Sequence, residues 1–424
     1  MFGSINLLKK APAVPRFHAI SRNLFELEKK PLFYPHFENS VRGSRPRTKT
    51  GGWNTVTVMP GVGTGPELAE VMFEVLECAG APLRYEVLHP ERNEEEYNYT
   101  LQSIKRNGVA IKGNIEPKSS TELFLAQPKN MRIKKDMDLF VDVIECKSFP
   151  GIENRMRVHK QLDIVVMRQN TEGEYALLEH EPVRNVLENV QIITYYNTKR
   201  VCEYAFNYAI ANNRCKVTLL HNQHVNPMTE NLMREAFDEV ANKYPDILGE
   251  KHTVNHGLKM LLKNKNAWDI VITNSVFGSM LVSILFGMIG SARLVAEANV
   301  GERYMIFEPA YRGRGLDIAG KDIVNPTGFI MSGVLALEGL GHKKPAEYIR
   351  QALNELYIEG KTLTIDLGGK ATTREFVRNL VQKLRNLAKL VHCKYDPIPK
   401  IPPTPPKPEP YDPKKDKLFT PPKV

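Results

Sequence analysis

Short apolar runs alternate with amphipathic stretches along most of the chain. The runs VTVM (56–59), LDIVVM (162–167), KVTLLH (216–221) and IVIT (270–273) have the length and composition of buried strands. Stretches with helical spacing follow the first and the third, namely PELAEVMFEVLECAG and MTENLMREAFDEVANKY. This alternation predicts an α/β fold with a largely parallel sheet and right-handed crossovers.

One segment, residues 270–292, carries no charge and is long enough for a membrane-spanning helix. Its internal pattern argues against a span. IVIT is typical of a buried strand, NSVFGS (274–279) of the loop after it, and MLVSILFGMIG (280–290) of the start of a buried helix. We therefore predict no membrane span.

The N-terminal region, residues 1–50, has the pattern of a mitochondrial transit peptide and a linker. The first acidic residue is Glu26, and the stretch before it is basic, contains serines and lacks an apolar segment long enough for secretion. A disordered basic N-terminus is the alternative. Prolines and Gly51-Gly52 mark the linker to a strand near Trp53, and the predicted location is the mitochondrial matrix.

The C-terminal region, residues 396–424, holds 11 of the chain's 29 prolines. Such a segment forms neither helix nor sheet, so we expect an extended, disordered polyproline II tail. Its PPTPPKPEP sequence resembles a peptide that docks into an aromatic groove of a protein, but the pattern favours a solvated low-complexity tail.

Composition indicates a globular protein, because 424 residues with 42% hydrophobic and 25% charged residues can bury a sizeable core. The formal net charge is +10, yet much of the excess lies in the two termini. The central part is nearly balanced, which gives no indication of a nucleic-acid partner. The five cysteines form no CxxC pair and no zinc-ligand spacing, so we expect reduced, mostly buried thiols.

A glycine-rich turn follows the first predicted strand, in VTVMPGVGTGPELAEV. Gly61 and Gly63 suggest a dinucleotide-binding fingerprint, but its third glycine position is Pro66, and no acidic residue ends a second strand in a convincing context. The local pattern favours a tight turn at a domain edge over a nucleotide cradle.

From about residue 51 to 385 the chain resembles the β-decarboxylating dehydrogenases, the family of isocitrate and isopropylmalate dehydrogenases. The resemblance runs in order through seven motifs, which are PGVGTGPEL, VAIKGNIE, DLFVDVIECKSFPG, VMRQNTEGEYALLEHE, ANVGERYMIFE, IAGKDIVNPT and IDLGGKATT. No single motif decides the resemblance, which rests on their number and order.

Within the family, the chain is most similar to the γ-type regulatory subunits of mitochondrial NAD-dependent isocitrate dehydrogenase. Ile144 stands where catalytic chains carry an arginine, and FEPAYRGRGLDIAGK has the γ-type loop length. Residues 311–315 replace the HGTAP turn that contacts the cofactor in catalytic chains. The resemblance leaves Arg312, Gly313 and Asn325 as the residues for any remaining cofactor contact.

The resemblance implies an isopropylmalate dehydrogenase-like two-domain α/β fold, distinct from a Rossmann fold. We expect a large domain of residues 53–139 plus 291–395 and a small dimerisation domain with a strand clasp, residues 140–290. The implied dimer surface covers about 175–195 and 225–290.

The metal site of the family is altered. Oxidative decarboxylation of isocitrate uses a divalent cation, which prefers carboxylate oxygens. The family supplies aspartates from two positions four apart on one helix and from a third on the neighbouring subunit. The corresponding residues are Ser279, Ser283 and Asn255. None carries a charge, so we expect no tight magnesium site.

The substrate site is also altered. Catalytic chains of the family hold the tricarboxylate with three arginines, because a guanidinium group binds a carboxylate through two hydrogen bonds. This sequence has Lys134, Ile144 and Arg168 there. Pro128 replaces a substrate-contacting serine, and Asn130 is retained, so Asn130, Lys134 and Arg168 are the candidates for substrate or effector binding.

Proton transfer in the family uses a tyrosine and a lysine from the neighbouring subunit. Tyr175 is present, but Asn222 replaces the lysine. Losing a positioned acid-base group typically removes about 10²–10⁴ in rate. His224 could substitute, although an ordinary structural role is favoured for it and for the nearby His221.

Two of these residues have a purely structural alternative. Tyr175 can pack at the domain interface, and Arg168 can be held by an acid such as Glu172. Val62 and Thr64 also replace family residues in the turn near the phosphate position, so binding of citrate or an adenine nucleotide is left open.

We therefore expect a non-catalytic, regulatory-type subunit that binds no cofactor tightly, with NAD and Mg²⁺ at a catalytic α-type partner in a heterodimer or higher oligomer. Two alternatives stay open. One is an active family enzyme with an altered 2-hydroxy acid substrate, and the other is a structural protein that uses the proline-rich tail for docking.

Overall fold

The computed structural model describes residues 52–116, 128–152, 161–263 and 268–388. The predicted transit peptide and linker in residues 1–50 and the predicted proline-rich tail in residues 396–424 lie outside the described residues.

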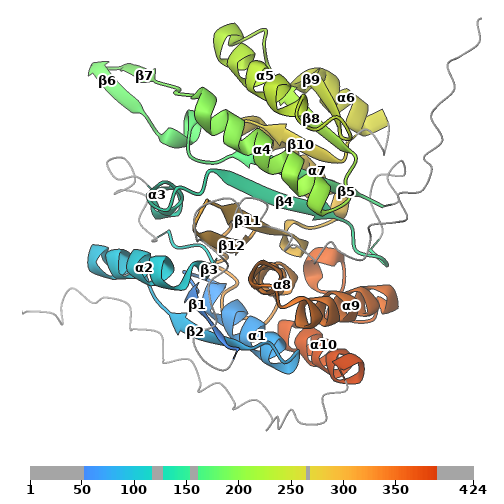
Figure 1. Ribbon diagram of the computed structural model, residues 1–424. Helices are drawn as coiled ribbons and strands as arrows, with labels where there is room; N and C mark the ends of the chain where they lie inside the picture. Colours follow the sequence, from blue (N-terminus) through green and yellow to red (C-terminus); the bar gives the residue numbers. More distant parts are fainter. Residues whose placement is uncertain (1–51, 117–127, 153–160, 264–267, 389–424) are drawn as a thin grey trace, which may run out of the picture. The chain divides into compact units, whose positions relative to one another are not determined.

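A ten-stranded sheet runs through the described chain in the order β2-β1-β3-β12-β11-β4-β5-β10-β8-β9 (Figure 1). Its strands are β1 (Asn54–Met59), β2 (Leu83–Val87), β3 (Val109–Lys112), β4 (Val141–Lys147), β5 (Asp163–Gln169), β8 (Lys216–His221), β9 (Leu248–Thr253), β10 (Ile270–Thr273), β11 (Ala296–Val300) and β12 (Met305–Pro309). The strands predicted at 216–221 and 270–273 have the predicted bounds.

The two sides of the sheet are parallel, and its centre is antiparallel. Strands β2, β1, β3 and β12 are parallel to one another, as are β5, β10, β8 and β9. The central pairings β12·β11, β11·β4 and β4·β5 are antiparallel. The sequence analysis predicts a largely parallel sheet and does not predict these antiparallel pairings at its centre. The β11–β12 connection, residues 301–304, is a short hairpin loop, which forces an antiparallel pair.

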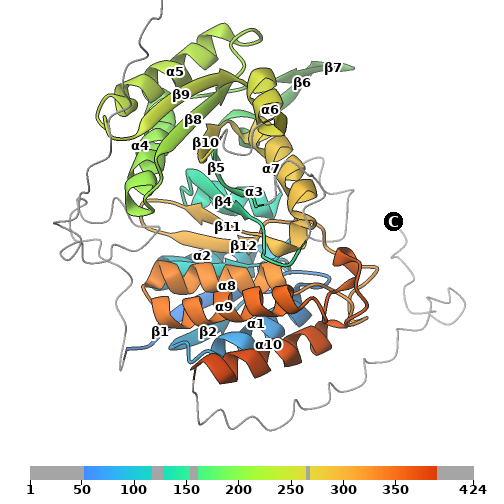
Figure 2. The same ribbon diagram turned by 90° about the vertical axis from the view of Figure 1, so that its right-hand side faces the viewer.

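Helices pack on both sides of this sheet (Figure 2). They are α1 (Gly65–Cys78), α2 (Glu94–Asn107), α3 (Lys129–Asp136), α4 (Tyr195–Ala211), α5 (Pro227–Ala241), α6 (Val254–Lys263), α7 (Ser275–Ile289), α8 (Thr327–Leu340), α9 (Lys343–Glu359) and α10 (Thr373–Ala388). Every residue of α8 is buried, because this helix packs between β11–β12 and the helices α1 and α9. Its sequence is accordingly mostly apolar around the whole helix, with Glu338 as its one charged residue.

The loop predicted at 274–279 is wrong, because α7 already begins at Ser275. The Asn274 side chain caps this helix by accepting a hydrogen bond from the Phe277 backbone N–H at 3.0 Å. Gly278 is a packing residue: a Cβ there would lie 3.0 Å from Cβ of Arg168 on β5. In the described part of the chain, the structure contains no helix long and apolar enough to cross a membrane.

A separate two-stranded hairpin, β6 (Glu179–Val183) and β7 (Val186–Asn189), extends away from the main sheet (Figure 1). All of its residues are exposed. It lies in the segment expected to form a clasp.

The domain division at residues 139/140 and 290/291 stays a prediction. The structure does place the five strands from residues 140–290 together on one side of the main sheet, namely β4, β5, β10, β8 and β9.

The described cysteines agree with the expectation of reduced, mostly buried thiols. Cys78, Cys146 and Cys202 are buried and Cys215 is exposed, and none of these four forms a disulfide bond.

Candidate functional site

The glycine-rich turn brings three backbone segments together at one end of β1. Gly63 has φ +69°, and a Cβ there would lie 2.0 Å from the carbonyl oxygen of Arg314. Gly61 has φ +77°, and a Cβ there would lie 2.2 Å from the carbonyl oxygen of Asn114. Glycine is required at both positions by the positive φ and by the lack of space. The turn therefore packs tightly against the loops that contain Asn114 and Arg314.

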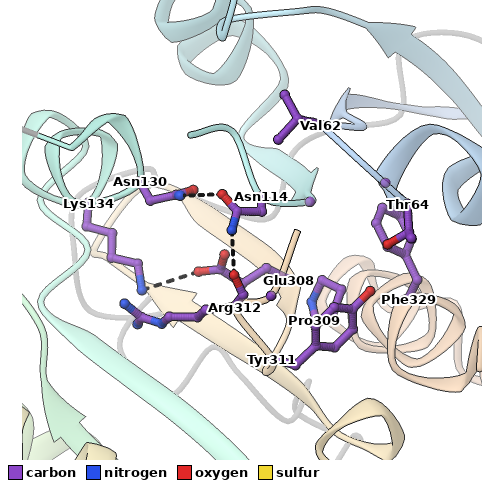
Figure 3. Close-up of a pocket in the computed structure, with 13 residues that line it drawn as sticks. Val62, Thr64, Asn114, Asn130, Lys134, Glu308, Pro309, Tyr311, Arg312 and Phe329 are labelled. Atoms are coloured by element: carbon purple, nitrogen blue, oxygen red, sulfur yellow. Dashed lines mark hydrogen bonds and ion pairs between the residues drawn. The ribbon is translucent and has the colours of Figure 1, made fainter. Parts of the chain in front are cut away.

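These segments border a cleft (Figure 3). Four of the predicted site residues line it, namely Asn130, Lys134, Arg312 and Gly313. Val62 and Thr64 from the turn line it as well. The predicted cofactor loop and part of the predicted substrate site thus meet at one cleft.

An amide network fixes the rim of the cleft. Asn130 donates to Oδ1 of Asn114 at 2.9 Å, and Asn114 donates to the carbonyl oxygen of Arg312 at 2.6 Å (Figure 3). The Lys112 ammonium donates to Oδ1 of Asn130 at 2.8 Å. The side chain of Asn130 is therefore already engaged on both its donor and its acceptor side.

Asn325 does not line the cleft. It is buried, donates to Oδ2 of Asp366 at 3.1 Å and accepts the backbone N–H of Thr327 at 3.0 Å. These bonds hold the start of α8. The side chain therefore has a structural function, and a cofactor contact by Asn325, Arg312 or Gly313 stays a prediction.

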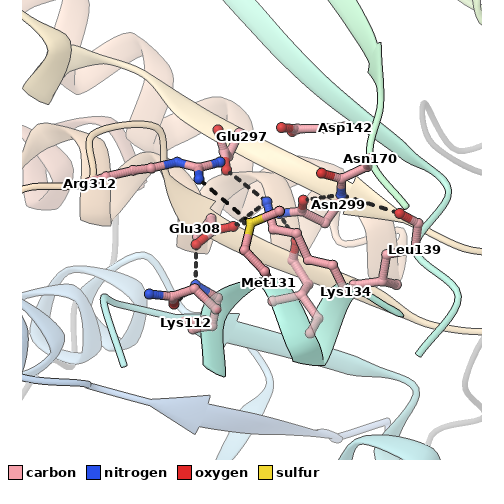
Figure 4. Close-up of polar contacts among 12 residues, drawn as sticks. Lys112, Met131, Lys134, Leu139, Asp142, Asn170, Glu297, Asn299, Glu308 and Arg312 are labelled. Atoms are coloured by element: carbon pink, nitrogen blue, oxygen red, sulfur yellow. Dashed lines mark hydrogen bonds and ion pairs between the residues drawn. The ribbon is translucent and has the colours of Figure 1, made fainter. Parts of the chain in front are cut away.

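A cluster of buried charges lies beneath the cleft (Figure 4). Lys112 at the end of β3 forms an ion pair with Glu308 on β12, and both side chains are nearly inaccessible to solvent. Lys134 on α3 lies 3.2 Å from Oε1 of Glu308 and 3.6 Å from Oε1 of Glu297 on β11. The lysine that replaces a substrate-binding arginine thus already faces two carboxylates of its own chain.

Arg168 belongs to the same cluster. Its Nε donates to Oδ2 of Asp142 on β4 at 2.6 Å, and its Nη2 lies 3.4 Å from Oε2 of Glu297. The proposed partner Glu172 is wrong: its carboxylate accepts the Thr194 hydroxyl at 2.8 Å instead. The backbone explains the difference, because Asp142 and Arg168 are directly paired residues of β4 and β5.

The cluster shifts the pKa values of its acids in opposite directions. Burial raises the pKa of Glu297 to about 8, and the nearby Asp142 carboxylate adds to this effect. Burial alone would also raise the pKa of Glu308, but the attraction of Lys112 and Lys134 outweighs it and holds that pKa well below 4.5. Burial lowers the pKa of Lys112.

At the metal positions the structure shows bonded hydroxyls. The Ser279 hydroxyl accepts a hydrogen bond from Nη1 of Arg168 at 2.7 Å, donates to the Ser275 carbonyl at 3.0 Å and is hydrogen-bonded to the Tyr175 hydroxyl. The Ser283 hydroxyl donates to the Ser279 carbonyl at 2.9 Å. These neutral groups, turned toward their own helix and a guanidinium, do not fit a magnesium ion.

The other predicted proton-transfer and metal positions lie around the ends of β8 and β9. Asn222 follows β8, and its backbone N–H donates to Oε2 of Glu230 at 2.9 Å. His224 and Asn255 are exposed. His221 is buried, and burial with the positive charges of Arg234 and Lys251 lowers its pKa, so it is neutral at physiological pH.

Two further predicted positions have ordinary structural roles. Ile144 is fully buried in β4, and Pro128 precedes α3 and makes no side-chain cap hydrogen bond.

Sequence reasoning did not select the acids of the cluster. Glu297 and Glu308 are the single charges of the buried strands β11 and β12, Lys112 ends the buried strand β3, and Asp142 is a buried charge in β4, which also holds Glu145 and Lys147 toward its other end. A single charge in a buried strand needs a partner. This signal could have identified each of the four residues, although not which ones pair.

Comparisons with known proteins agree on one family. The family model described as isocitrate/isopropylmalate dehydrogenase matches residues 55–380. The mitochondrial NAD isocitrate dehydrogenase subunit gamma of Homo sapiens is 36% identical over 342 residues, which are 80% of this chain and 86% of that protein. A mitochondrial NAD isocitrate dehydrogenase regulatory subunit of Dictyostelium discoideum is 35% identical over 353 residues, 82% of this chain and 96% of that protein. The solved isocitrate dehydrogenase of Methylococcus capsulatus has a TM-score of 0.72 and 29% identity, covering 78% of this chain and 99% of that one.

Proposed function

The chain belongs to the isocitrate/isopropylmalate dehydrogenase family, and we propose that it is a non-catalytic, regulatory-type subunit of the mitochondrial NAD-dependent isocitrate dehydrogenase complex. In this role it supports a catalytic partner that converts isocitrate to 2-oxoglutarate in the tricarboxylic acid cycle. Relatives named as γ and regulatory subunits support membership in a hetero-oligomeric complex.

The hydrogen bonding of Ser279 is the observation that supports a chain without catalytic activity. Its hydroxyl accepts from Arg168 and donates to the backbone of its own helix, at a position where the family reaction needs a carboxylate on a metal ion. A neutral hydroxyl lacks the negative charge that stabilises a bound divalent cation. No step of metal-assisted decarboxylation can therefore be assigned to this chain.

The charge cluster supports the same conclusion. Lys134 and Arg168 correspond to substrate-binding arginines, and each faces carboxylates of this chain within 3.6 Å. An incoming tricarboxylate would have to compete with these internal acids for the same two cations. The arrangement opposes tight binding of isocitrate.

Assembly with a partner requires a surface, and the exposed apolar side chains of β6, β7 and α7 offer one. Leu187 on β7 is 77% exposed, and Met280 on α7 is 59% exposed. An isolated two-stranded hairpin is marginal in water, so a clasp of this kind gains stability from a partner. Both elements lie within the predicted dimer surface, residues 175–195 and 225–290.

The proposal assigns NAD and Mg²⁺ to the catalytic α-type partner. It assigns the complex to the mitochondrial matrix, since the relatives are named as mitochondrial proteins and the sequence predicts a transit peptide. The proline-rich tail stays a candidate segment for docking a further protein.

Co-expression with a catalytic α-type subunit tests this proposal. We expect the two chains to co-purify and the partner's isocitrate-dependent NADH formation to rise. Replacing Leu187 by aspartate should reduce co-purification, whereas Ile365→Asp, at a similarly exposed isoleucine outside the predicted dimer surface, should not. Separate elution of the wild-type chains would contradict a support function and favour a structural protein that uses the fold alone.

A further inference from the structure

One cation of the charge cluster retains unused hydrogen-bonding capacity. Lys134 is 2% exposed and lines the cleft, yet its ammonium group forms no hydrogen bond among the described residues. Lys134 forms ion pairs with Glu308 at 3.2 Å and with Glu297 at 3.6 Å, but the N–H groups of its ammonium donate no hydrogen bond to these carboxylates. A buried ammonium group in this state favours an acceptor that enters from the cleft.

Glu297 is the acid that competes for this cation. Its Oε1 lies 3.6 Å from Nζ of Lys134, and its Oε2 lies 3.4 Å from Nη2 of Arg168. One carboxyl group thus bridges the two cations that the family resemblance assigns to substrate or effector carboxylates. Asp142 and Glu308 each have a closer cation, Arg168 and Lys112 respectively.

We propose that Glu297 is an internal counter-ion that controls access of polycarboxylate anions to Lys134 and Arg168, so that such anions bind only when Glu297 has lost its negative charge. This inference deepens the proposed function, because it rests on a degenerate site that binds ligands without turnover. It adds a specificity-determining residue that family membership does not supply.

The physical basis is the local sum of charge. The charged groups facing Glu297 are Lys134 on α3, Arg168 on β5, Asp142 on β4 and Glu308 on β12, with Lys112 and Arg312 also within electrostatic reach. An ionised Glu297 repels an incoming carboxylate, and its neutralisation adds one positive charge to the local sum, which rises from +1 to +2 over these groups. Burial raises the pKa of Glu297 to about 8, so this change of state occurs near neutral pH.

Calorimetric titration of the whole chain with citrate, a tricarboxylate, tests the inference. When only the neutral form binds, the apparent affinity scales with the fraction of that form. With a pKa of about 8, this fraction is about nine-tenths at about pH 7 and one-tenth at about pH 9, so we expect the Kd of the wild-type chain to be roughly tenfold higher at the upper pH. Glu297→Gln should bind at both pH values as tightly as the wild type does at the lower one.

The matched control is Glu338→Gln, which alters a buried acid ion-paired with Arg350, outside the cluster. It should keep the wild-type pH dependence. A pH-independent wild-type Kd would overturn the inference, as would a tenfold pH effect that persists in Glu297→Gln and so comes from a group other than Glu297. Absence of citrate binding by a folded Glu297→Gln chain would overturn it as well.

If Glu297→Gln does not fold, a pH-independent Kd of the wild-type chain still overturns the inference. Co-purification with a catalytic subunit is a separate readout, so failure of this inference leaves the test of the proposed function unaffected.

Discussion

Replacing Arg168 by methionine should destabilise the folded chain strongly. Arg168 is 3% exposed, and its neighbours Asp142 and Glu297 are buried to the same degree. Methionine retains the length of the side chain but leaves Asp142 without its 2.6 Å hydrogen bond, and leaves Tyr175 and Ser279 without their guanidinium donor. Removing one partner of a buried ion pair typically costs about 3–5 kcal/mol, because the remaining charge is uncompensated.

Thermal unfolding followed by circular dichroism measures this effect. In a chain of this size about 1 kcal/mol corresponds to roughly 2 °C, so Arg168→Met should lower Tm by about 5–10 °C. The matched control is Arg106→Met, because Arg106 is about half exposed in its ion pair with Glu86 and such pairs contribute about 1 kcal/mol or less. An equal decrease in Tm in the two variants would refute the conclusion that the buried ion pair of Arg168 contributes more to stability than an exposed ion pair does. Partial recovery of Tm in Arg168→Met/Asp142→Asn would support the assigned pairing.

Three further perturbations test other parts of the account. The pKa of Glu297 is raised from 4.5 to about 8 in the folded chain, so its contribution to stability is complete below pH 4.5 and is lost as pH rises through 8. The fall in Tm over this pH range should be smaller in Glu297→Gln than in the wild-type chain. An equal fall in both proteins would contradict the raised pKa of Glu297. Gly63→Ala should lower the free energy of unfolding by at least about 1–3 kcal/mol, because the added Cβ would meet a carbonyl oxygen and the backbone has a positive φ. Gly313→Ala has open space around it and should change the free energy of unfolding by less than about 0.5 kcal/mol in the same denaturation assay. Tyr175→Phe should lower stability by about 0.5–1.5 kcal/mol through the lost bond to Ser279, and a loss above 3 kcal/mol would indicate a larger role for this hydroxyl.

Local patterns in the sequence are sufficient to predict much of the fold. The strands at 216–221 and 270–273 are predicted with their bounds, because short β-branched runs between polar segments leave few alternatives. The predicted isopropylmalate dehydrogenase-like fold is confirmed by the family match and by the similarity to a solved isocitrate dehydrogenase. The predicted start of α7 is wrong, because Gly278 suggests a loop in the sequence but serves close packing against Arg168 in the structure.

The arrangement of the candidate site could not be predicted in the same way. Lys112 and Glu308 are 196 positions apart in the sequence, and their ion pair depends on the neighbouring positions of β3 and β12 in the sheet. The sequence identified Lys134 and Arg168 as candidate cations, but no local pattern shows which acids face them. That information comes from strand order and register, as for Asp142 opposite Arg168.

The central claim is that this chain has no working centre for metal-dependent decarboxylation. Its most direct test is NADH formation by the purified chain alone, at high protein concentration with isocitrate, NAD and Mg²⁺. We expect a rate no higher than that of a Ser279→Ala variant, because neither a hydroxyl nor a methyl group at position 279 supplies the negative charge that stabilises a bound Mg²⁺. Clear turnover that depends on Mg²⁺ and is lost in Ser279→Ala would contradict the account and would show that hydroxyl groups support the reaction.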